Sequence, residues 1–180
     1  MQKIELPHSM LEISCIGFGG WPVAGGFNWG WQDTKESVKA IHKAFENGIN
    51  FFDTAPGYGS GDSEKIIGKE LKKYRNQVIF ATKVSPNDFN YQALKNACEQ
   101  RLSAMNTDYI DLLQLHWPNN EIPIGETLSA LEDLKMEGKI RAYGFSNYGV
   151  KGLNEALAEG AKISCIQLPY NLLWRAIEFE

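Results

Sequence analysis

Short runs of apolar residues alternate along this chain with longer segments in which apolar positions recur every three or four residues. Recurrence at that spacing predicts an amphipathic helix, and a short apolar run bounded by turn residues predicts a buried strand. A hairpin is predicted over residues 3–14, around a Pro-His-Ser turn. The predicted strands of the main body cover residues 15–19, 50–53, 78–83, 109–117, 140–146 and 163–168. The predicted helices begin at Asp33, at Asp62 or Ser63 and at Asn90, and cover residues 126–137 and 151–159.

Three of the predicted helices stop at a glycine that lies just before a predicted strand, namely Gly48, Gly138 and Gly160. Glycine is favoured there because it readily adopts the left-handed conformation that ends a helix. The first helix also has a start signal, since Asp33 can cap its amino terminus and Glu36 follows three residues later. Regular alternation of strand and helix predicts an α/β fold with a parallel sheet, either doubly wound or closed as a barrel.

Polar or glycine residues stand at the carboxyl end of every predicted strand. In chain order these are Gly20 with Trp21, then Asp53, Lys83, His116, Ser146 with Asn147, and Gln167. A doubly wound sheet gathers only the strand ends near its switch point, whereas a barrel gathers all of them at one face. The pattern therefore favours a (β/α)8 barrel of the TIM type. Each residue alone also has a structural interpretation, as a capping carboxylate, a solvated lysine, a core histidine or a helix cap.

Three of these side chains, together with Tyr58 from the loop that follows Asp53, could form a proton-donating site. A free tyrosine has a pKa near ~10, and a nearby ammonium group lowers it. We therefore expect Lys83 to lower the pKa of Tyr58, Asp53 to hold Lys83, and His116 to add a hydrogen bond to a substrate oxygen. The set contains no nucleophile, so a reduced nicotinamide is the natural source of electrons for reducing a carbonyl. Ser146, Asn147 and Gln167 carry hydroxyl and amide groups suited to a carboxamide.

The sequence resembles the aldo-keto reductase family over all of its residues. The motifs that carry the resemblance are FFDTAPGYGSGDSEKIIG, the lysine that ends FATK, LLQLHWP, GFSN and IQLPYN, in the order of the family. The resemblance implies an NADPH-dependent reductase of aldehydes and ketones, with NADH not excluded. It implies a catalytic tetrad of Asp53, Tyr58, Lys83 and His116. It implies cofactor contacts from Gly20, Trp21, Asp53, Ser146, Asn147 and Gln167. It implies a substrate pocket lined by Tyr58, His116 and Trp117 and by Trp29 or Trp31.

Two other enzyme classes fit the sequence less well. A Rossmann dehydrogenase would need G-x-G-x-x-G, but Pro22 occupies the third glycine position of GFGGWP. A metal-dependent hydrolase would need clustered histidine and carboxylate ligands. Of the histidines, only His116 ends a predicted strand, and we therefore expect no metal site.

Composition limits the partners. The chain has 180 residues, 43% of them hydrophobic, which predicts one domain over residues 1–180. Its net charge of −4 gives no support for nucleic-acid binding, and no apolar run is long enough to predict a membrane span or signal peptide. Cys15, Cys98 and Cys165 are far apart and lie in apolar or helical segments, so we expect buried thiols in a cytoplasmic protein.

Length sets a further expectation. An eight-stranded barrel typically needs ~250 residues, whereas this chain holds six strand positions. We therefore expect a barrel truncated after its sixth strand, with weak or absent NADPH binding by this chain alone and recovery when the missing part is restored. Self-association could cover the open edges. The alternative to an enzyme is a catalytically inactive reductase-like fragment that serves as a binding or assembly subunit.

Overall fold

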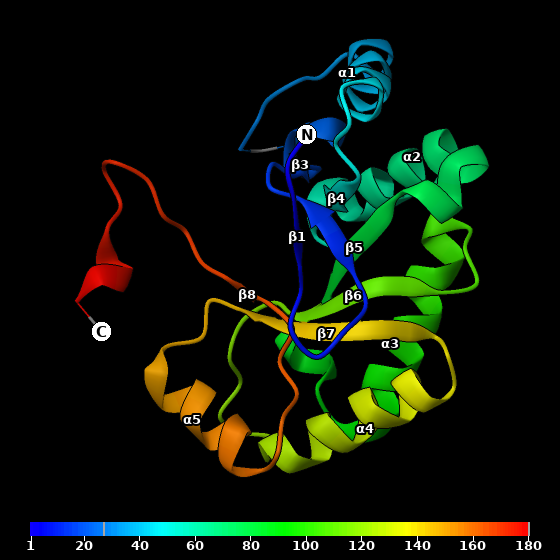
Figure 1. The fold of residues 1–180 in the computed structure, drawn as a ribbon. Coiled ribbons are helices and arrows are strands. Elements are labelled where there is room, and N and C mark those ends of the chain that lie inside the picture. The colour runs from blue at the N-terminus through cyan, green and yellow to red at the C-terminus, as the bar shows by residue number, and fades with distance from the viewer. Residues whose placement is uncertain (27, 180) are drawn as a thin grey trace.

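The computed structural model describes residues 1–26 and 28–179, and its centre is a curved parallel sheet of six strands (Figure 1). The strands of this sheet are β3 (Phe18–Gly19), β4 (Phe51–Asp53), β5 (Ile79–Val84), β6 (Ile110–Leu115), β7 (Ile140–Ser146) and β8 (Ile166–Gln167). The helices are α1 (Thr34–Glu46), α2 (Asp62–Leu71), α3 (Tyr91–Met105), α4 (Ile124–Met136) and α5 (Val150–Ala158). Short 3-10 helices are η1 (Trp21–Ala24), η2 (Tyr58–Gly61), η3 (Lys72–Gln77), η4 (Pro86–Asp88) and η5 (Ala176–Glu178).

The order of the strands confirms the barrel type. They are paired as β3-β4-β5-β6-β7-β8, each parallel to its neighbour, so spatial order follows chain order. In a doubly wound sheet the order of the strands reverses at a switch point, and the order of the described strands does not reverse. The helices lie on the outer side of the curved sheet, as in an arc of a β/α barrel (Figure 1).

Alternation along the strands divides the core into an outer and an inner part. On the outer side, two apolar clusters join the strands to the helices, one around Phe52 and Phe80 and one around Leu113 and Phe145. On the inner side, Ala81 and its inward-facing neighbours pack against the amino-terminal hairpin. The inner cluster consists of Leu6, Leu11, Ile13, Ile79, Ala81, Leu112 and Ala142.

The hairpin predicted over residues 3–14 is confirmed as the antiparallel pair β1 (Lys3–Glu5) and β2 (Glu12–Ser14). It is tied to the start of β4 by Asn50, whose side chain accepts from the Ser14 amide at 2.6 Å and donates to the Glu12 carbonyl at 2.8 Å. Because its apolar side chains enter the inner cluster, the hairpin covers the interior of the sheet on the side away from the strands' carboxyl ends.

The start and end signals of α1 are confirmed in part. The Asp33 carboxylate caps the helix by accepting from the Lys35 amide at 2.8 Å, and Gly48 after the helix has a φ of +85°. The Glu36 carboxylate pairs with Lys39 at 2.6 Å, so its side chain serves a surface ion pair one turn along instead of a capping box.

Two predicted strands are shorter and less buried than expected. Residues 15–19 form a strand only at Phe18–Gly19, and residues 163–168 only at Ile166–Gln167. Both are outermost strands of the described sheet, which pair on one side only, and this limits their ladders to two residues. The expectation of three buried thiols is wrong for Cys15, which is exposed in the link between β2 and β3, outside both sheets. Cys98 is buried and Cys165 is half-buried.

Within residues 1–26 and 28–179, each helix is too short or too polar to cross a membrane.

Candidate active site

The parallel sheet brings the predicted site residues to one edge, because every strand ends there. A cleft of roughly 630 Å³ opens at this edge. Its lining comes from the carboxyl ends of the six strands and the loops that follow them: Trp21, Asn28, Gly57, Tyr58, Lys83, His116, Trp117, Ser146, Asn147, Gln167, Leu168 and Pro169. Residues separated by almost 150 positions in sequence therefore face a common space.

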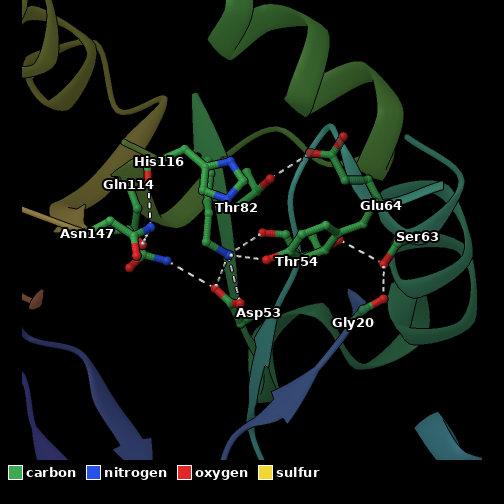
Figure 2. A network of polar contacts seen from close by, with 12 residues as sticks. Gly20, Asp53, Thr54, Ser63, Glu64, Thr82, Gln114, His116 and Asn147 are labelled. Carbon is green, nitrogen blue, oxygen red and sulfur yellow. Dashed lines mark hydrogen bonds and ion pairs between the residues drawn. The ribbon is translucent and has the colours of Figure 1, made fainter. Parts of the chain in front are cut away.

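Lys83 and Asp53 form an ion pair at the bottom of the cleft. The Lys83 ammonium donates to both Asp53 oxygens, at 2.9 and 2.8 Å, and to the Thr54 carbonyl at 2.9 Å (Figure 2). The Lys83 side chain is only 1% exposed and that of Asp53 is 13% exposed. A charge buried this deeply needs a partner of opposite sign, and the carboxylate supplies it.

Tyr58 comes next to this pair from the loop after β4. Its hydroxyl oxygen lies 3.4 Å from the Lys83 nitrogen and accepts a hydrogen bond from it. Because an ammonium group only donates, the hydroxyl proton of Tyr58 is left free to be donated to another group. Gly59 follows with a φ of +58°, and a side chain there would collide with Ala24, so this turn requires glycine.

The expected direction of the Tyr58 pKa is wrong. Burial, followed by the negative charge of Asp53, raises the pKa of Tyr58 to about 12. The sequence indicates that Lys83 lies near the phenol, but it does not show how deeply the phenol is buried. Asp53 is bonded to the same ammonium and opposes its influence on the phenol. At neutral pH Tyr58 is therefore a fully protonated phenol.

Burial also moves the other two titrating groups toward their neutral forms. Burial lowers the pKa of Lys83. The charge and the hydrogen bonds of Asp53 oppose this shift. Burial lowers the pKa of His116 to about 4, and the positive charge of Lys83 adds to this effect. His116 is therefore a neutral imidazole at pH 7. Its ring stands edge-on to Tyr58, with the ring centres 6.1 Å apart.

Ser146, Asn147 and Gln167 form a polar wall on the other side of the cleft. The Asn147 side-chain amide donates to the His116 carbonyl at 2.9 Å and to the Ser146 hydroxyl at 3.1 Å. Its backbone amide donates to the Gln167 carbonyl at 3.0 Å. Asn147 has a φ of +62°, a conformation that asparagine tolerates better than most residues, and this turns the chain sharply after β7.

Gly20 is fixed between β4 and α2. Its amide donates to the Asp53 carbonyl at 2.7 Å, and its carbonyl accepts from the Ser63 hydroxyl at 2.7 Å. The Thr54 hydroxyl donates in turn to the Ser63 oxygen at 2.8 Å (Figure 2). These contacts fix the start of η1, and Trp21 stacks on the Tyr58 ring with the centres 5.6 Å apart.

Of the four tryptophans predicted to lie at the site, two line the cleft. Trp21 and Trp117 line it, whereas Trp29 meets Trp21 edge-to-face with the ring centres 5.8 Å apart. The structure does not bring Trp31 to the cleft, since this side chain is 85% exposed.

Two buried polar residues near the cleft were not predicted from the sequence. Gln114 donates to Asp53 Oδ1 at 3.0 Å, and the Glu64 carboxylate accepts from the Thr82 hydroxyl at 2.6 Å (Figure 2). Gln114 lies in β6 two residues before His116, which directly follows the strand, and side chains at that spacing along an extended chain share a face. That spacing is a signal by which the sequence could have indicated it.

Among the described residues, no group of three or more histidine, cysteine, aspartate or glutamate side chains is arranged to hold a metal ion. The cleft brings together a phenol, an ammonium–carboxylate pair, a neutral imidazole and an amide-bearing wall. The hydroxyl and amides of that wall fit a carboxamide group, which a nicotinamide carries.

Comparison with known proteins relates this cleft to one family. The family described as "Aldo/keto reductase family" matches residues 15–179. Aldo-keto reductase YhdN of Bacillus subtilis is 41% identical over 99% of this chain and 56% of its own length. The NADH-specific methylglyoxal reductase of Escherichia coli is 35% identical over all of this chain and 62% of its own length.

A solved structure shows the same arrangement of elements. The aldo/keto reductase from Klebsiella pneumoniae, crystallised in complex with NADP and acetate, superposes with a TM-score of 0.87 at 30% identity. The match covers 98% of this chain and 62% of that protein. The chain thus spans less than two thirds of the length of these proteins.

Proposed function

The chain belongs to the aldo/keto reductase family, and we propose that its cleft reduces aldehydes or ketones to alcohols with a reduced nicotinamide cofactor. The observation that carries this proposal is the contact of Tyr58 with the buried Lys83–Asp53 pair at the bottom of a cleft. A carbonyl oxygen that gains negative charge needs a proton donor beside it.

Tyr58 is the proposed proton donor. A phenol with a pKa of about 12 holds its proton throughout the neutral range, and Lys83 occupies its oxygen as a donor. The hydroxyl proton is therefore available to a substrate oxygen in the cleft. As the phenol gives up its proton, the ammonium 3.4 Å away stabilises the phenolate that forms.

His116 is proposed to bind the same substrate oxygen. With a pKa of about 4 it is neutral, so one ring nitrogen carries a proton and can donate a hydrogen bond. A neutral donor stabilises the developing charge without competing with Tyr58 as the acid. Trp21 and Trp117 give the cleft apolar walls, which suit the carbon part of a small carbonyl compound.

Ser146, Asn147 and Gln167 are proposed to hold the carboxamide of NADPH or NADH, with Gly20, Trp21 and Asp53 beside it. When bound, the cofactor supplies the hydride that the protein side chains lack. The cofactor assignment is supported by relatives of both kinds, since one structure contains NADP and another relative is named NADH-specific.

The test is the oxidation of NADPH and of NADH by this chain, with each cofactor raised to high concentration because weak binding is expected, at increasing concentrations of several aldehydes, methylglyoxal included. We expect carbonyl-dependent oxidation, and a loss of about 10²–10⁴-fold in Tyr58→Phe, the usual contribution of general acid catalysis. Tyr74→Phe is the matched control, because Tyr74 stacks on Phe45 far from the cleft. A Tyr58→Phe rate within a few-fold of the parent rate contradicts the assignment of the acid.

A second candidate function is a binding or assembly subunit that lacks catalysis. The observation in its favour is exposed apolar side chains along β8, α5 and the segment that follows. These are Val150, Leu157, Ile166, Leu172, Leu173 and Trp174. Self-association through this surface predicts a concentration-dependent mass in light scattering, reduced by Leu157→Glu. Oligomers combined with an absence of carbonyl-dependent cofactor oxidation would favour this function over the reductase.

A further inference from the structure

Gln114 is buried where the surrounding pattern calls for an apolar residue. It is 1% exposed and lies in β6 between leucines at positions 112, 113 and 115, all of them fully buried. Its Oε1 atom has no hydrogen-bond partner among the described residues. An unpaired amide oxygen inside a protein destabilises the fold, and a leucine or methionine would fill the same space without that penalty. Packing alone therefore does not explain a glutamine here.

The other end of the amide group has a specific contact. Its Nε2 atom donates to Asp53 Oδ1 at 3.0 Å. An ionised carboxylate only accepts, which requires the nitrogen and not the oxygen of the amide to face Asp53. In the sheet register Gln114 is the direct neighbour of Lys83 on one side and of Gly144 on the other. Gln114 and Lys83 thus approach the same carboxylate from adjacent strands.

The contact matters because Lys83 has more acceptors than protons. Its three protons face four oxygens: both of Asp53, the Thr54 carbonyl and the Tyr58 hydroxyl. The Tyr58 contact is the longest at 3.4 Å, so it is the first to be lost if the carboxylate rotates or shifts. A second donor on Oδ1 opposes rotation of the Asp53 carboxylate and thereby fixes the direction of the ammonium.

We propose that Gln114 is a positioning residue, which holds Asp53 so that the Lys83 ammonium remains in contact with the Tyr58 hydroxyl. Its role in turnover rests on the proposed carbonyl reduction, while its hold on the Asp53–Lys83 pair does not. The effect is carried through Asp53 and Lys83, because Gln114 is absent from the lining of the described cleft.

The first experiment needs no turnover. The buried ammonium of Lys83 should give a resolved ¹H–¹⁵N signal, because its protons are hydrogen-bonded and shielded from water. In Gln114→Leu we expect its exchange with water to become about tenfold faster, since its acceptor Asp53 is no longer held in place. Leu112→Val is the matched control: it alters packing one inward-facing position earlier on β6 and leaves Asp53 untouched. Unchanged exchange in Gln114→Leu, or equal acceleration in the control, overturns the proposal.

The second experiment uses the rate of carbonyl reduction. Gln114→Leu should lower kcat about tenfold with little change in KM, because misplaced catalytic groups slow the chemical step more than they weaken binding. Gln114→Glu is the diagnostic variant. When protonated it can still donate to Asp53, and when ionised it repels that carboxylate.

The kcat of Gln114→Glu should therefore approach the parent value at low pH and fall as the pH rises. A pH-independent loss indicates a packing role and contradicts the proposal. If the parent chain shows no turnover, or if Tyr58→Phe retains the parent rate, the proposed function fails. The exchange of the Lys83 ammonium then still decides whether Gln114 holds the pair.

Discussion

The ammonium nitrogen of Lys83 lies 3.4 Å from the hydroxyl oxygen of Tyr58, although the two residues belong to different strand–loop units. Lys83 is hydrogen-bonded to Asp53 and to the Thr54 carbonyl, and the ring of Tyr58 is stacked against Trp21. The phenol therefore sits between a buried charge and an aromatic wall.

The Lys83–Asp53 pair should be strongly coupled. Asp53→Asn leaves the ammonium buried without its counter-charge, so we expect the free energy of unfolding to fall by about 3–5 kcal/mol. The pKa of Lys83, already lowered by burial, should fall further because Asp53 no longer opposes the shift. The double variant Asp53→Asn with Lys83→Met should lose much less stability than the sum of the two single variants. Urea unfolding at pH 7 measures this, and strictly additive losses would contradict the coupling.

Tyr58 should resist ionisation in alkali. Its pKa of about 12 lies above that of free tyrosine, so at pH 10 about 1% of Tyr58 is phenolate, against about half of a free tyrosine. The absorbance of phenolate at about 295 nm should thus be nearly the same at pH 10 for the parent and for Tyr58→Phe. A parent excess of more than half a phenolate would show that Lys83 outweighs burial and lowers the pKa of Tyr58, as expected from the sequence.

His116 should make the fold sensitive to acid. Its folded pKa of about 4 is below the ordinary value of 6.5, so between these pH values the unfolded chain binds more protons. Stability is therefore complete above pH 6.5 and is lost as the pH falls toward 4. The ring is partly exposed, which reduces the expected contribution to about 1–2 kcal/mol.

Unfolding in urea at pH 7 and pH 4.5 measures this loss. His116→Gln should show a smaller loss of stability between the two pH values than the parent. His8→Asn is the control, since His8 lies in the hairpin turn away from the site. An unchanged loss in His116→Gln would assign the acid sensitivity to other groups.

Gly20 should not tolerate a side chain. A Cβ atom there would stand 2.7 Å from the Ser63 hydroxyl, 2.8 Å from Ile67 and 2.9 Å from the Asp53 carbonyl. We expect Gly20→Ala to lower the unfolding free energy by about 1–3 kcal/mol, the usual cost of overpacking. It should also move Trp21 off Tyr58, which a change in tryptophan fluorescence would report.

The neighbouring glycine provides the control for this prediction. Gly19→Ala meets no atom within 4 Å and should leave both the stability and the fluorescence near the parent values. Equal effects of the two substitutions would show that the packing around Gly20 is not what fixes the loop.

The sequence by itself determined the order of elements and the edge at which the site lies. Helix stops at Gly48 and Gly138, together with apolar runs at the strands, are local signals that a single chain segment carries. The rule that parallel strands of a barrel end at one face then brought Asp53, Lys83 and His116 together. The same local signals were weakest for the outermost strands, where Cys15 proved exposed, because burial there depends on neighbours far along the chain.

Only the tertiary structure decided the electrostatics and the fine positions. The pKa of Tyr58 is raised because desolvation and Asp53 outweigh the ammonium, a balance that depends on how deeply each group is buried. The hydrogen bond of Gln114 joins positions 61 residues apart, and the exposure of Trp31 follows from the path of a loop. Local sequence specifies which side chains are present at the edge of the sheet. Desolvation and long-range contacts, which exist only in the folded chain, decide what those side chains do.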